Sequence, residues 1–531
     1  MASSDGTGHW WQRAIIYQVY PRSFQDSDGD GIGDLEGIRH RLDHLERLGI
    51  DTIWLSPIYP SPMADFGYDV ADYGDIDGRF GTMADFDRLI ADVHRRGMKL
   101  VLDFVPNHSS DHHPWFVQSR SSRESPKRDW YIWRDPKPDG SPPNNWMSHF
   151  GGSTWTFDAA TGQYYLHSFL KEQPDLNWRN PQVKQAIFDV LRFWLGKGVD
   201  GFRVDVIWCL VKDEHFRDNP VNPDWKPGLG DRERLISIYE CDRPEMMGLV
   251  AEMRAVLDTY PGDRLLIGEI YLPLDRLVAY YGVDLKGAQL PFNFLLIGAT
   301  WSADSIGRIV ADYNAALPAG AWPNWVLSNH DRSRIASRVG PAQARVAAML
   351  LLTLRGTPTI YYGEEIGMLD TPIPPELVQD PSEKRQPGIG LGRDPVRTPM
   401  PWDASPTGGF TTGHPWLPLG EHATTNVAAE SRDPHSMLSL YEKLIALRHA
   451  QPALIGGTIE AIAWGDGVVS YERRLGAARL KIVLNLTREP RHAVGDGGRV
   501  LLSTTLSREG EHVSERLDLG ADEGVVVALG S

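Results

Sequence analysis

The chain has 531 residues and a formal net charge of −16, from 54 basic and 70 acidic residues. An acidic balance of this size argues against binding to nucleic acid or to an anionic membrane surface. Hydrophobic residues make up 41% and charged residues 23% of the chain, as in a soluble globular protein. The length predicts one large domain with smaller ones attached.

Neither export nor membrane insertion is expected. The longest apolar run, 346–352, is far too short to cross a bilayer, and the first residues, 1–6, contain neither a basic region nor an apolar one. Only two cysteines occur, Cys209 and Cys241, and this scarcity fits a reducing compartment. We therefore expect a cytoplasmic location, no nucleic-acid or membrane partner, and either a monomer or a homodimer.

Short apolar strands alternate with amphipathic helices along most of the chain. The first strand is followed by a predicted helix over Leu35–Leu48, which Gly49 ends, and the next strand by a helix around 86–93. The predicted strands lie at 15–20, 50–55, 99–105, 199–206, 265–268, 288–294, 325–328 and 359–362. Strand–helix repeats are typical of parallel βα units. Eight of them predict an α/β fold with a closed (β/α)₈ TIM barrel.

Two segments depart from this rhythm. Residues 109–175 are rich in Pro, Ser, Trp and Asp and are too long for a simple loop, so we expect an inserted subdomain after strand 3. From 453 to 531 the apolar residues alternate in β fashion, which predicts a C-terminal antiparallel β-sandwich. The barrel would then comprise 1–108 and 176–452, with a loop-rich excursion at about 371–420.

Polar residues cluster at the C-terminal ends of the predicted strands, the face on which barrel enzymes build their active sites. A buried pair such as Arg203 and Asp205 on strand 4 could be structural, but further carboxylates and histidines converge on the same rim. This group comprises Asp103, His108, Arg203, Asp205, Glu269, Asn329, His330 and Asp331. Their convergence favours a catalytic site.

Two carboxylates that flank an acetal carbon are the requirement of glycoside hydrolysis. Arg203 is expected to lower the pKa of Asp205, which suits an ionised nucleophile. Glu269 lies in the apolar frame 266–270, which favours the protonated form that a general acid needs. Asp331 is then left to bind sugar hydroxyls and to stabilise developing positive charge.

Four segments resemble the motifs of glycoside hydrolase family 13, the α-amylase family, in order and spacing. They are Asp103–His108, Gly201–Asp205, Gly268–Glu269 and Ser328–Asp331. Three others, 173–177, 356–364 and 397–402, resemble its oligo-1,6-glucosidase and α-glucosidase subfamily. The resemblance extends over essentially the whole chain, with the inserted subdomain and the C-terminal β domain where the family has them.

The resemblance implies a retaining, exo-acting α-glucosidase whose substrates are short oligosaccharides and other small α-glucosides. Asp205 would be the nucleophile, Glu269 the general acid/base and Asp331 the transition-state stabiliser. Asp65 and Tyr68 would hold the terminal glucose, with Arg397 pairing with Asp65 or with a hydroxyl. The remaining implied pocket residues are His108, Arg203, His330, Phe150 and Phe169, the two phenylalanines being either apolar walls or subdomain core. An α-glucosyl transferase or isomerase with the same site, similar to trehalose synthase or sucrose isomerase, is the alternative.

An acidic turn early in the chain predicts a metal site. In the segment 26–34, carboxylates alternate with glycines that permit a tight turn, and such oxygen ligands suit Ca²⁺ or Mg²⁺. The expected ligands are Asp26, Asp28, Asp30, the Ile32 carbonyl and Asp34. Because position twelve is Gly37 where an EF-hand has a bidentate Glu, we expect a structural ion and not a sensor; the alternative is a solvated acidic turn. No organic cofactor is expected.

The residue after the expected nucleophile bears on linkage preference. Val206 resembles the residue type of α-1,6-active members of the family, whereas α-1,4-active members more often carry Thr or Ala. One methyl-for-hydroxyl difference changes selectivity by only about 1–3 kcal/mol. Val206 could equally be a packing residue of the barrel.

Overall fold

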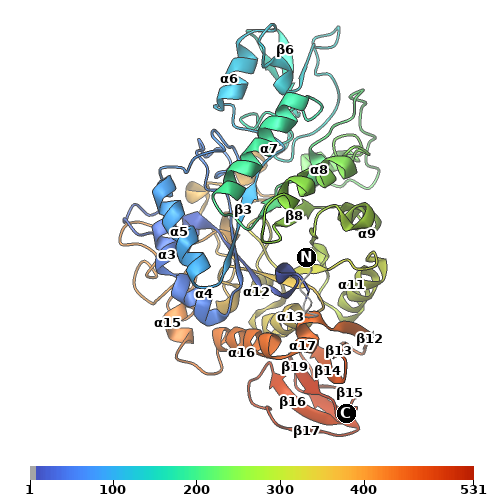
Figure 1. Cartoon of the computed structure of the whole chain (residues 1–531). Coiled ribbons are helices and arrows are strands. Elements are labelled where there is room, and N and C mark those ends of the chain that lie inside the picture. The colour runs from blue at the N-terminus through green and yellow to red at the C-terminus, as the bar shows by residue number, and fades with distance from the viewer. Residues whose placement is uncertain (1–7, 531) are drawn as a thin grey trace.

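A computed structural model describes residues 8–530, so the segment 1–6, used above to argue against export, lies outside the described residues. Figure 1 shows a central barrel, with the inserted segment projecting from one end and the C-terminal β domain packed at the other. Within 8–530, no helix is long and apolar enough to span a membrane.

The barrel prediction is confirmed, because eight parallel strands form one sheet in the order β10-β11-β1-β2-β3-β7-β8-β9. All eight overlap the predicted segments. Their bounds are β1 (Ile16–Val19), β2 (Thr52–Leu55), β3 (Lys99–Phe104), β7 (Gly201–Val204), β8 (Leu265–Ile270), β9 (Leu290–Asn293), β10 (Asn324–Val326) and β11 (Thr357–Tyr361).

A side chain bridges β9 and β10, the two ends of this strand order. The buried Asn324 donates from Nδ2 to the Pro291 carbonyl (2.6 Å) and accepts at Oδ1 from the Asn293 N–H (2.8 Å). Pro291 has no N–H to offer, so a regular ladder would be interrupted here in any case. The Asn324 amide thus supplies the hydrogen bonds that hold the barrel together at this seam.

Helices surround the sheet (Figure 1), among them α5 (Met83–Arg95), α7 (Pro181–Gly196), α8 (Met246–Asp258), α11 (Ala303–Ala316), α13 (Pro341–Thr353) and α16 (Met437–Ala450). The single helix expected over 35–48 is wrong: α3 (Leu35–His40) and α4 (Leu42–Leu48) separate at Arg41, where ψ is 6°. The Arg41 guanidinium donates to Gln25 Oε1 and lies 4.1 Å from the Trp402 ring centre. Gly49 ends α4 in the left-handed region, as expected.

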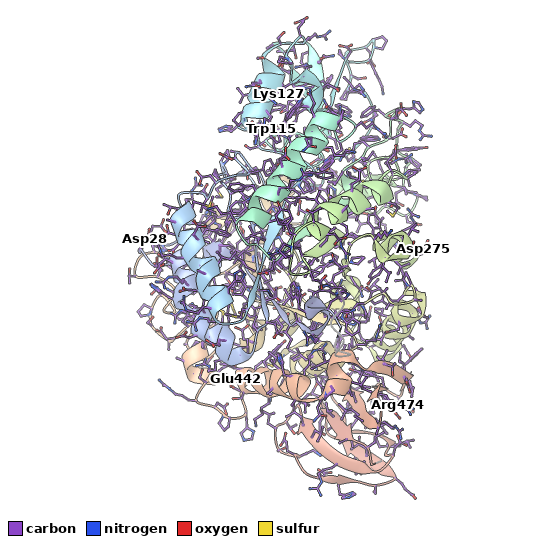
Figure 2. All side chains as sticks on the ribbon, in the orientation of Figure 1. Asp28, Trp115, Lys127, Asp275, Glu442 and Arg474 are labelled. Atoms are coloured by element: carbon purple, nitrogen blue, oxygen red, sulfur yellow. A yellow bond between two sulfur atoms is a disulfide. The ribbon has the colours of Figure 1, made fainter. Side chains whose placement is uncertain are left out.

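The inserted segment carries α6 (Pro114–Ser121) and an antiparallel sheet of β4 (Trp133–Arg134), β6 (Gln163–Leu166) and β5 (Trp155–Asp158). Figure 2 marks Trp115 and Lys127 there, and the Lys127 ammonium lies 3.1 Å from the centre of the Trp130 ring. Such a cation–π contact stabilises a subdomain that has few strands of its own.

The C-terminal part is antiparallel, as predicted. One sheet contains β12 (Thr458–Gly465), β13 (Val468–Leu475), β14 (Ala478–Asn485), β19 (Gly524–Ala528), β16 (Gly498–Ser503) and β17 (His512–Val513). A second pairs β15 (Arg491–Val494) with β18 (Arg516–Leu519). The exact domain boundaries stay predictions.

Cys209 and Cys241 form a disulfide. Cys209 ends the 3₁₀ helix η2 (Ile207–Cys209) after β7, and the chain returns to it after 32 residues. The scarcity of cysteines therefore does not indicate a reducing compartment. The number of cysteines does not predict whether they pair, because pairing depends on which segments the fold brings together. The cytoplasmic location stays a prediction.

Candidate active site

The site is organised around the fully buried side chain of Arg203 on β7. Its Nη1 donates to Asp103 Oδ1 (2.8 Å) and to Asp205 Oδ1 (2.9 Å), and its Nη2 lies 2.9 Å from Glu269 Oε2. Burial alone would lower the pKa of Arg203, but the surrounding carboxylates outweigh burial and raise it. The guanidinium therefore contacts three carboxylates at the C-terminal ends of β3, β7 and β8. It requires these partners, because a buried charge without them costs roughly several kcal/mol.

Asp205 and Glu269 each lie 2.9 Å from a nitrogen of the Arg203 guanidinium. Burial, together with the charge of Glu269, raises the pKa of Asp205 well above its ordinary value despite Arg203. The expected lowering of this pKa is therefore wrong: one guanidinium shared among three buried carboxylates cannot offset both their desolvation and their mutual repulsion.

Val206 departs from the predicted strand. β7 ends at Val204, and Val206 has φ 38° and ψ 42°, in the left-handed region, which is a strained conformation for a β-branched residue. This turn directs the Val206 N–H to Glu269 Oε2 at 2.9 Å. Its side chain lines the cavity and packs with the disulfide. The packing interpretation is therefore confirmed, whereas its role in linkage preference stays a prediction.

Asp331 follows β10 and faces the same cavity. Its Oδ1 accepts from Arg397 Nη2 (3.0 Å) and Arg393 Nη1 (3.4 Å). Burial opposes ionisation, but positively charged neighbours, these two arginines among them, outweigh it and lower the pKa of Asp331. Asp331 is thus an ionised carboxylate held in place by two guanidinium groups.

Of the two partners expected for Arg397, Asp65 is wrong, because Arg393 takes that place; a sugar hydroxyl stays a prediction. Arg393 Nη2 donates to Asp65 Oδ1 (2.6 Å) and Nε to Asp380 Oδ2 (2.6 Å). The fully buried Arg397 donates instead to Asp331 and, from Nε, to the His330 carbonyl (2.8 Å). Sequence reasoning missed Arg393, although it lies four residues before Arg397 across the short helix η8 (Asp394–Val396).

Tyr68, His108 and His330 are buried next to one another. The Tyr68 hydroxyl lies 3.0 Å from Asp103 Oδ2 and 2.6 Å from His330 Nε2, and its ring stacks on His330. His108 Nε2 lies 3.0 Å from the Tyr68 carbonyl and 3.1 Å from Gln173 Nε2. Burial lowers the pKa of His108 to about 4 and that of His330 well below its usual value. Both imidazoles are therefore neutral donors or acceptors at pH 7.

The two phenylalanines from the inserted segment line the cavity. Phe150 lies under the Arg393 guanidinium, 5.1 Å from ring centre to Cζ, and the Phe169 ring stacks on His149 at 4.5 Å. Both therefore form apolar walls, although Phe150 is also buried. Aromatic walls of this kind suit the C–H faces of a sugar.

The cavity has a volume of about 730 Å³. Sequence reasoning had not identified the rest of its lining, which comes from the inserted segment, from the β7–α8 connection and from the segments after β8, β10 and β11. These residues are His149, Trp208, Asn222, Arg232, Glu233, Leu235, Ile236, Ser237, Tyr271, Pro273, Arg332, Ser382, Leu391 and Arg393. They lie in irregular segments, where no periodicity marks which side chains face inward.

A buried lysine connects the inserted segment to the barrel. Lys212 Nζ lies 2.9 Å from Asp175 Oδ2 and donates to Asn107 Oδ1 (2.7 Å) and to the Cys209 carbonyl. Asp175 also accepts from the N–H and the hydroxyl of Ser168. This cation holds the segment after β3 against the loop that follows Asp205. The sequence analysis did not identify it.

The acidic turn brings Asp26, Asp28 and Asp34 together, with one oxygen of each within 4.8 Å of the others. Asp30 is not in this group; its Oδ1 accepts from the Ile32 N–H (2.7 Å). Burial raises the pKa of Asp34, whereas for Asp26 the effect of burial is outweighed by hydrogen bonds from Thr411 and three backbone N–H groups. Three carboxylate oxygens fit a hard cation. Figure 2 shows Asp28 at the outer edge of the barrel.

Comparison with known proteins agrees with this geometry. Residues 18–457 match the family model of the α-amylase catalytic domain. The chain is 44% identical to a probable α-glucosidase of Rhizobium meliloti (90% of each chain) and 39% identical to an oligo-1,6-glucosidase of Parageobacillus thermoglucosidasius (95% and 96%). The solved structure of an α-glucosyl transfer enzyme, XgtA, superposes with a TM-score of 0.93 at 39% identity, over 98% of this chain and all of that one. The chain is a glycoside hydrolase and belongs to the α-amylase family, glycoside hydrolase family 13.

Proposed function

We propose that the protein is a retaining, exo-acting α-glucosidase that releases terminal α-linked glucose from short oligosaccharides and small α-glucosides. One observation carries the proposal: Asp205, Glu269 and Asp331 face one cavity, two of them on the same guanidinium of Arg203. The relatives named α-glucosidase and oligo-1,6-glucosidase support this substrate class.

The proximity of Asp205 and Glu269 supports retention of configuration. Each lies 2.9 Å from a nitrogen of the same guanidinium. Retaining enzymes place their two carboxyl groups only about 5–5.5 Å apart, whereas inverting enzymes leave about 6.5–9.5 Å for a water. Asp205 attacks the anomeric carbon while Glu269 protonates the leaving oxygen, and Glu269 then deprotonates the water that releases glucose.

The ion pair of Asp65 with Arg393 supports exo action. Together with Phe150 it closes one side of the cavity with buried charged groups that can hydrogen-bond to the hydroxyls of one glucose. A polysaccharide chain would have to pass through this wall. A pocket of this kind accepts a chain end.

External nucleophiles provide the test. In Asp205→Gly, azide should restore turnover of an activated α-glucoside and yield β-glucosyl azide; in Glu269→Ala it should yield α-glucosyl azide. The wild-type enzyme should release α-glucose first, as seen by proton NMR at early times. Release of β-glucose first, or the opposite azide products, would contradict the roles of the two carboxylates.

The alternative is transfer of glucose to a second sugar, as the name of the XgtA structure states for that enzyme. The two outcomes differ only in whether water or a sugar reaches the glucosyl-enzyme. Product analysis with maltose, isomaltose, sucrose and trehalose separates them, because transfer gives new disaccharides in place of glucose. The same panel tests Val206: a preference for isomaltose over maltose supports its role in α-1,6 selectivity.

We also propose a structural Ca²⁺, or Mg²⁺, at Asp26, Asp28 and Asp34. Adding Ca²⁺ to chelator-treated protein should raise the melting temperature, and Asp28→Asn should abolish that shift while sparing the active site. A shift that survives in Asp28→Asn would place the ion elsewhere. The cytoplasmic location and the monomeric or dimeric state are further proposals, which fractionation and sedimentation test.

A further inference from the structure

Gln18 is a fully buried polar residue inside the barrel, and the reaction derived above makes no use of it. It lies on β1 two residues after Ile16, so the two side chains point to the same side of the strand. Ile16 belongs to an apolar cluster that includes Trp54 of β2 and Val101 of β3. A primary amide among such side chains is costly unless it is hydrogen-bonded. The partners of Gln18 therefore indicate why an amide is present.

Both hydrogen atoms of the Gln18 amide have acceptors. Its Nε2 lies 3.2 Å from the Ser56 hydroxyl oxygen and 2.9 Å from His330 Nδ1. An imidazole nitrogen that accepts a hydrogen bond carries no proton itself. Gln18 thus places the single proton of the neutral His330 ring on the other nitrogen, Nε2.

The neighbours of Nε2 agree with this tautomer. The Tyr68 oxygen lies 2.6 Å from Nε2 and 3.0 Å from Asp103 Oδ2. Tyr68 has one proton, and an ionised carboxylate can only accept, so Tyr68 donates to Asp103 and accepts from Nε2. A second acceptor, Asp331 Oδ2, lies 3.3 Å from Nε2. A chain of hydrogen bonds therefore runs from Gln18 through the imidazole and Tyr68 to Asp103.

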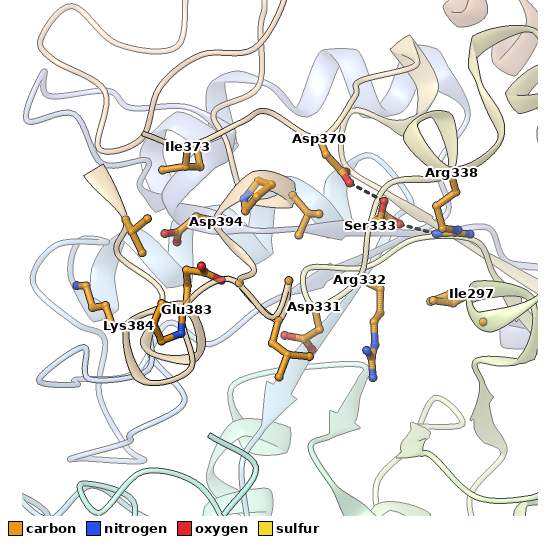
Figure 3. Close-up of a pocket in the computed structure, with 18 of the residues that line it drawn as sticks. Ile297, Asp331, Arg332, Ser333, Arg338, Asp370, Ile373, Glu383, Lys384 and Asp394 are labelled. Carbon is orange, nitrogen blue, oxygen red and sulfur yellow. Dashed lines mark hydrogen bonds between the residues drawn. The ribbon is translucent and has the colours of Figure 1, made fainter. Parts of the chain in front are cut away.

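The proton on Nε2 lies at the cavity in which glucose binds. A second cavity, of about 1030 Å³, lies beside the active-site cavity, and Asp331 lines both (Figure 3). Of these two cavities in the described part of the chain, His330 lines only the one with Asp205 and Glu269. Stacking on Tyr68, with planes 4° apart, fixes the plane of the ring. Stacking does not select the nitrogen that carries the proton, so hydrogen bonds decide it.

We propose that Gln18 is a positioning residue of the active site: its amide donates to His330 Nδ1 and so keeps the imidazole proton on Nε2, facing Asp331 and the bound sugar. The inference rests on the proposed function and adds to it a residue that does not line the cavity. The opposite tautomer would turn a lone pair toward the Asp331 carboxylate and remove a donor from the glucose pocket. Loss of Gln18 is therefore expected to change kcat/KM as well as stability.

Two substitutions separate proton placement from packing. In Gln18→Glu a carboxylate of nearly the same size accepts from Nδ1–H and draws the proton away from Nε2. In Gln18→Met the side chain fills a similar volume but neither donates nor accepts. At the pH at which the new carboxyl group is ionised, kcat/KM should fall by roughly 100-fold in Gln18→Glu and by about tenfold or less in Gln18→Met.

The pH profile provides a readout that packing alone does not change. Acid protonates the introduced carboxyl group, which then donates to Nδ1 as the amide does, so the activity of Gln18→Glu relative to wild type should recover as the pH falls. The charged groups around His330 are unchanged in the variants, so this recovery reports on position 18; they are Arg203, Asp331, Arg393 and Arg397. Gln18→Met should keep a constant ratio to wild type.

Nitrogen NMR locates the proton without depending on turnover. In wild-type protein with ¹⁵N-labelled histidine, Nε2 of His330 should show the chemical shift of a protonated nitrogen and Nδ1 that of an unprotonated one; His330→Gln identifies the two signals by their loss. In Gln18→Glu these shifts should be reversed wherever kcat/KM is reduced. A wild-type proton on Nδ1, reduced activity in Gln18→Glu without the reversal, or unchanged activity in both Gln18 variants would overturn the proposal.

The matched control is Gln289→Met, which removes another buried amide. Gln289 precedes β9, accepts from the Leu266 N–H (2.7 Å) and donates to the Arg264 carbonyl (2.8 Å). This variant should keep kcat/KM within about twofold of the wild-type value, and a loss equal to that of Gln18→Met would overturn the proposal. If the wild-type protein hydrolysed no α-glucoside at all, the proposed function would fail while NMR still reported on the proton of His330.

Discussion

Replacing Arg393 by alanine should impair both the glucose pocket and the stability of the segment that carries it. Arg393 is mostly buried and contacts three carboxylates: Asp65 and Asp380 at 2.6 Å each and Asp331 at 3.4 Å. Asp380 in turn accepts from the Ser382 N–H. The guanidinium therefore joins the loop after β2, the Asp331 segment and the excursion after β11.

The size of the expected loss in kcat/KM follows from the carboxylates that lose their cation. Removing one partner of a buried ion pair costs about 3–5 kcal/mol, because the remaining carboxylate has no compensation. If most of this loss falls on the transition state through Asp65 and Asp331, kcat/KM should fall by roughly 100- to 1000-fold. Arg393→Lys should recover only part of it, since an ammonium group cannot replace the planar fork that reaches several carboxylates at once.

The pH profile distinguishes this mechanism from simple loss of packing. Burial already raises the pKa of Asp65, and the charge of Arg393 opposes that rise. Without Arg393 the pKa of Asp65 should rise further, so that Asp65 is protonated at neutral pH and ionises only in more alkaline solution. The kcat/KM of Arg393→Ala should therefore increase with pH in a range where that of the wild type does not.

The matched control is Arg432→Ala, which removes an exposed arginine that lines neither the active-site cavity nor the cavity beside it. It should change kcat/KM by less than about threefold and leave the pH profile unaltered. The reasoning is refuted if Arg393→Ala retains near-wild-type activity, or if its loss is the same at every pH. In the first case Arg397 would hold Asp65 after all.

Three further predictions concern the frame of the site. Lys212→Met should lower the melting temperature and speed proteolysis within 109–175, because the buried Asp175 loses its cation, at a cost of about 3–5 kcal/mol. The control is Lys171→Met, at an exposed lysine. Equal rates of proteolysis in the two variants would contradict the role of Lys212. Cys241→Ser should lower the free energy of unfolding by about 3–4 kcal/mol, which is the chain-entropy value for a disulfide that closes a loop of 32 residues. Absence of the disulfide from purified wild-type protein, as seen by mass spectrometry, would contradict this prediction. Burial lowers the pKa of His113 to about 4, whereas in the unfolded chain it is about 6.5. The free energy of unfolding therefore falls as the pH drops from 6.5 toward 4, because the unfolded state takes up the proton first. The loss is up to about 1.4 kcal/mol per pH unit. His113→Asn, which keeps a helix N-cap, should therefore gain in melting temperature relative to wild type over that range, and parallel pH curves would refute it.

The regular part of the fold was predictable because its signal is local. Each barrel strand is a short apolar run such as Leu100–Phe104, buried on both faces, and the order of strands and helices leaves few topologies. The parallel arrangement then brings strand ends together, which is why Asp205, Glu269 and Asp331 could be expected on one rim. The break at Arg41 was not predictable, since the contacts of Arg41 with Gln25 and Trp402 come from distant segments.

The residues missed at the site share a physical reason. Arg393 and Arg397 lie four residues apart in an irregular segment, and only the path of the chain decides which guanidinium meets Asp65. Lys212 likewise follows a 3₁₀ turn and has no periodic neighbours. Its role becomes visible only when the inserted segment brings Asp175 beside it.

The pKa of Asp205 shows why a pairwise argument fails at such a site. Beside Arg203 alone, Asp205 would be a strong acid, but Arg203 is shared with Asp103 and Glu269, and all four groups are buried. Burial raises the pKa of Asp103 to about 6, despite the same guanidinium. The cluster has three carboxylates for one cation, so their mutual repulsion, added to burial, opposes the ionisation of Asp205. In the proposed double displacement a carboxyl group must give a proton to the glycosidic oxygen, and the same shortage of positive charge that contradicts the simple expectation for Asp205 favours keeping a proton within the cluster.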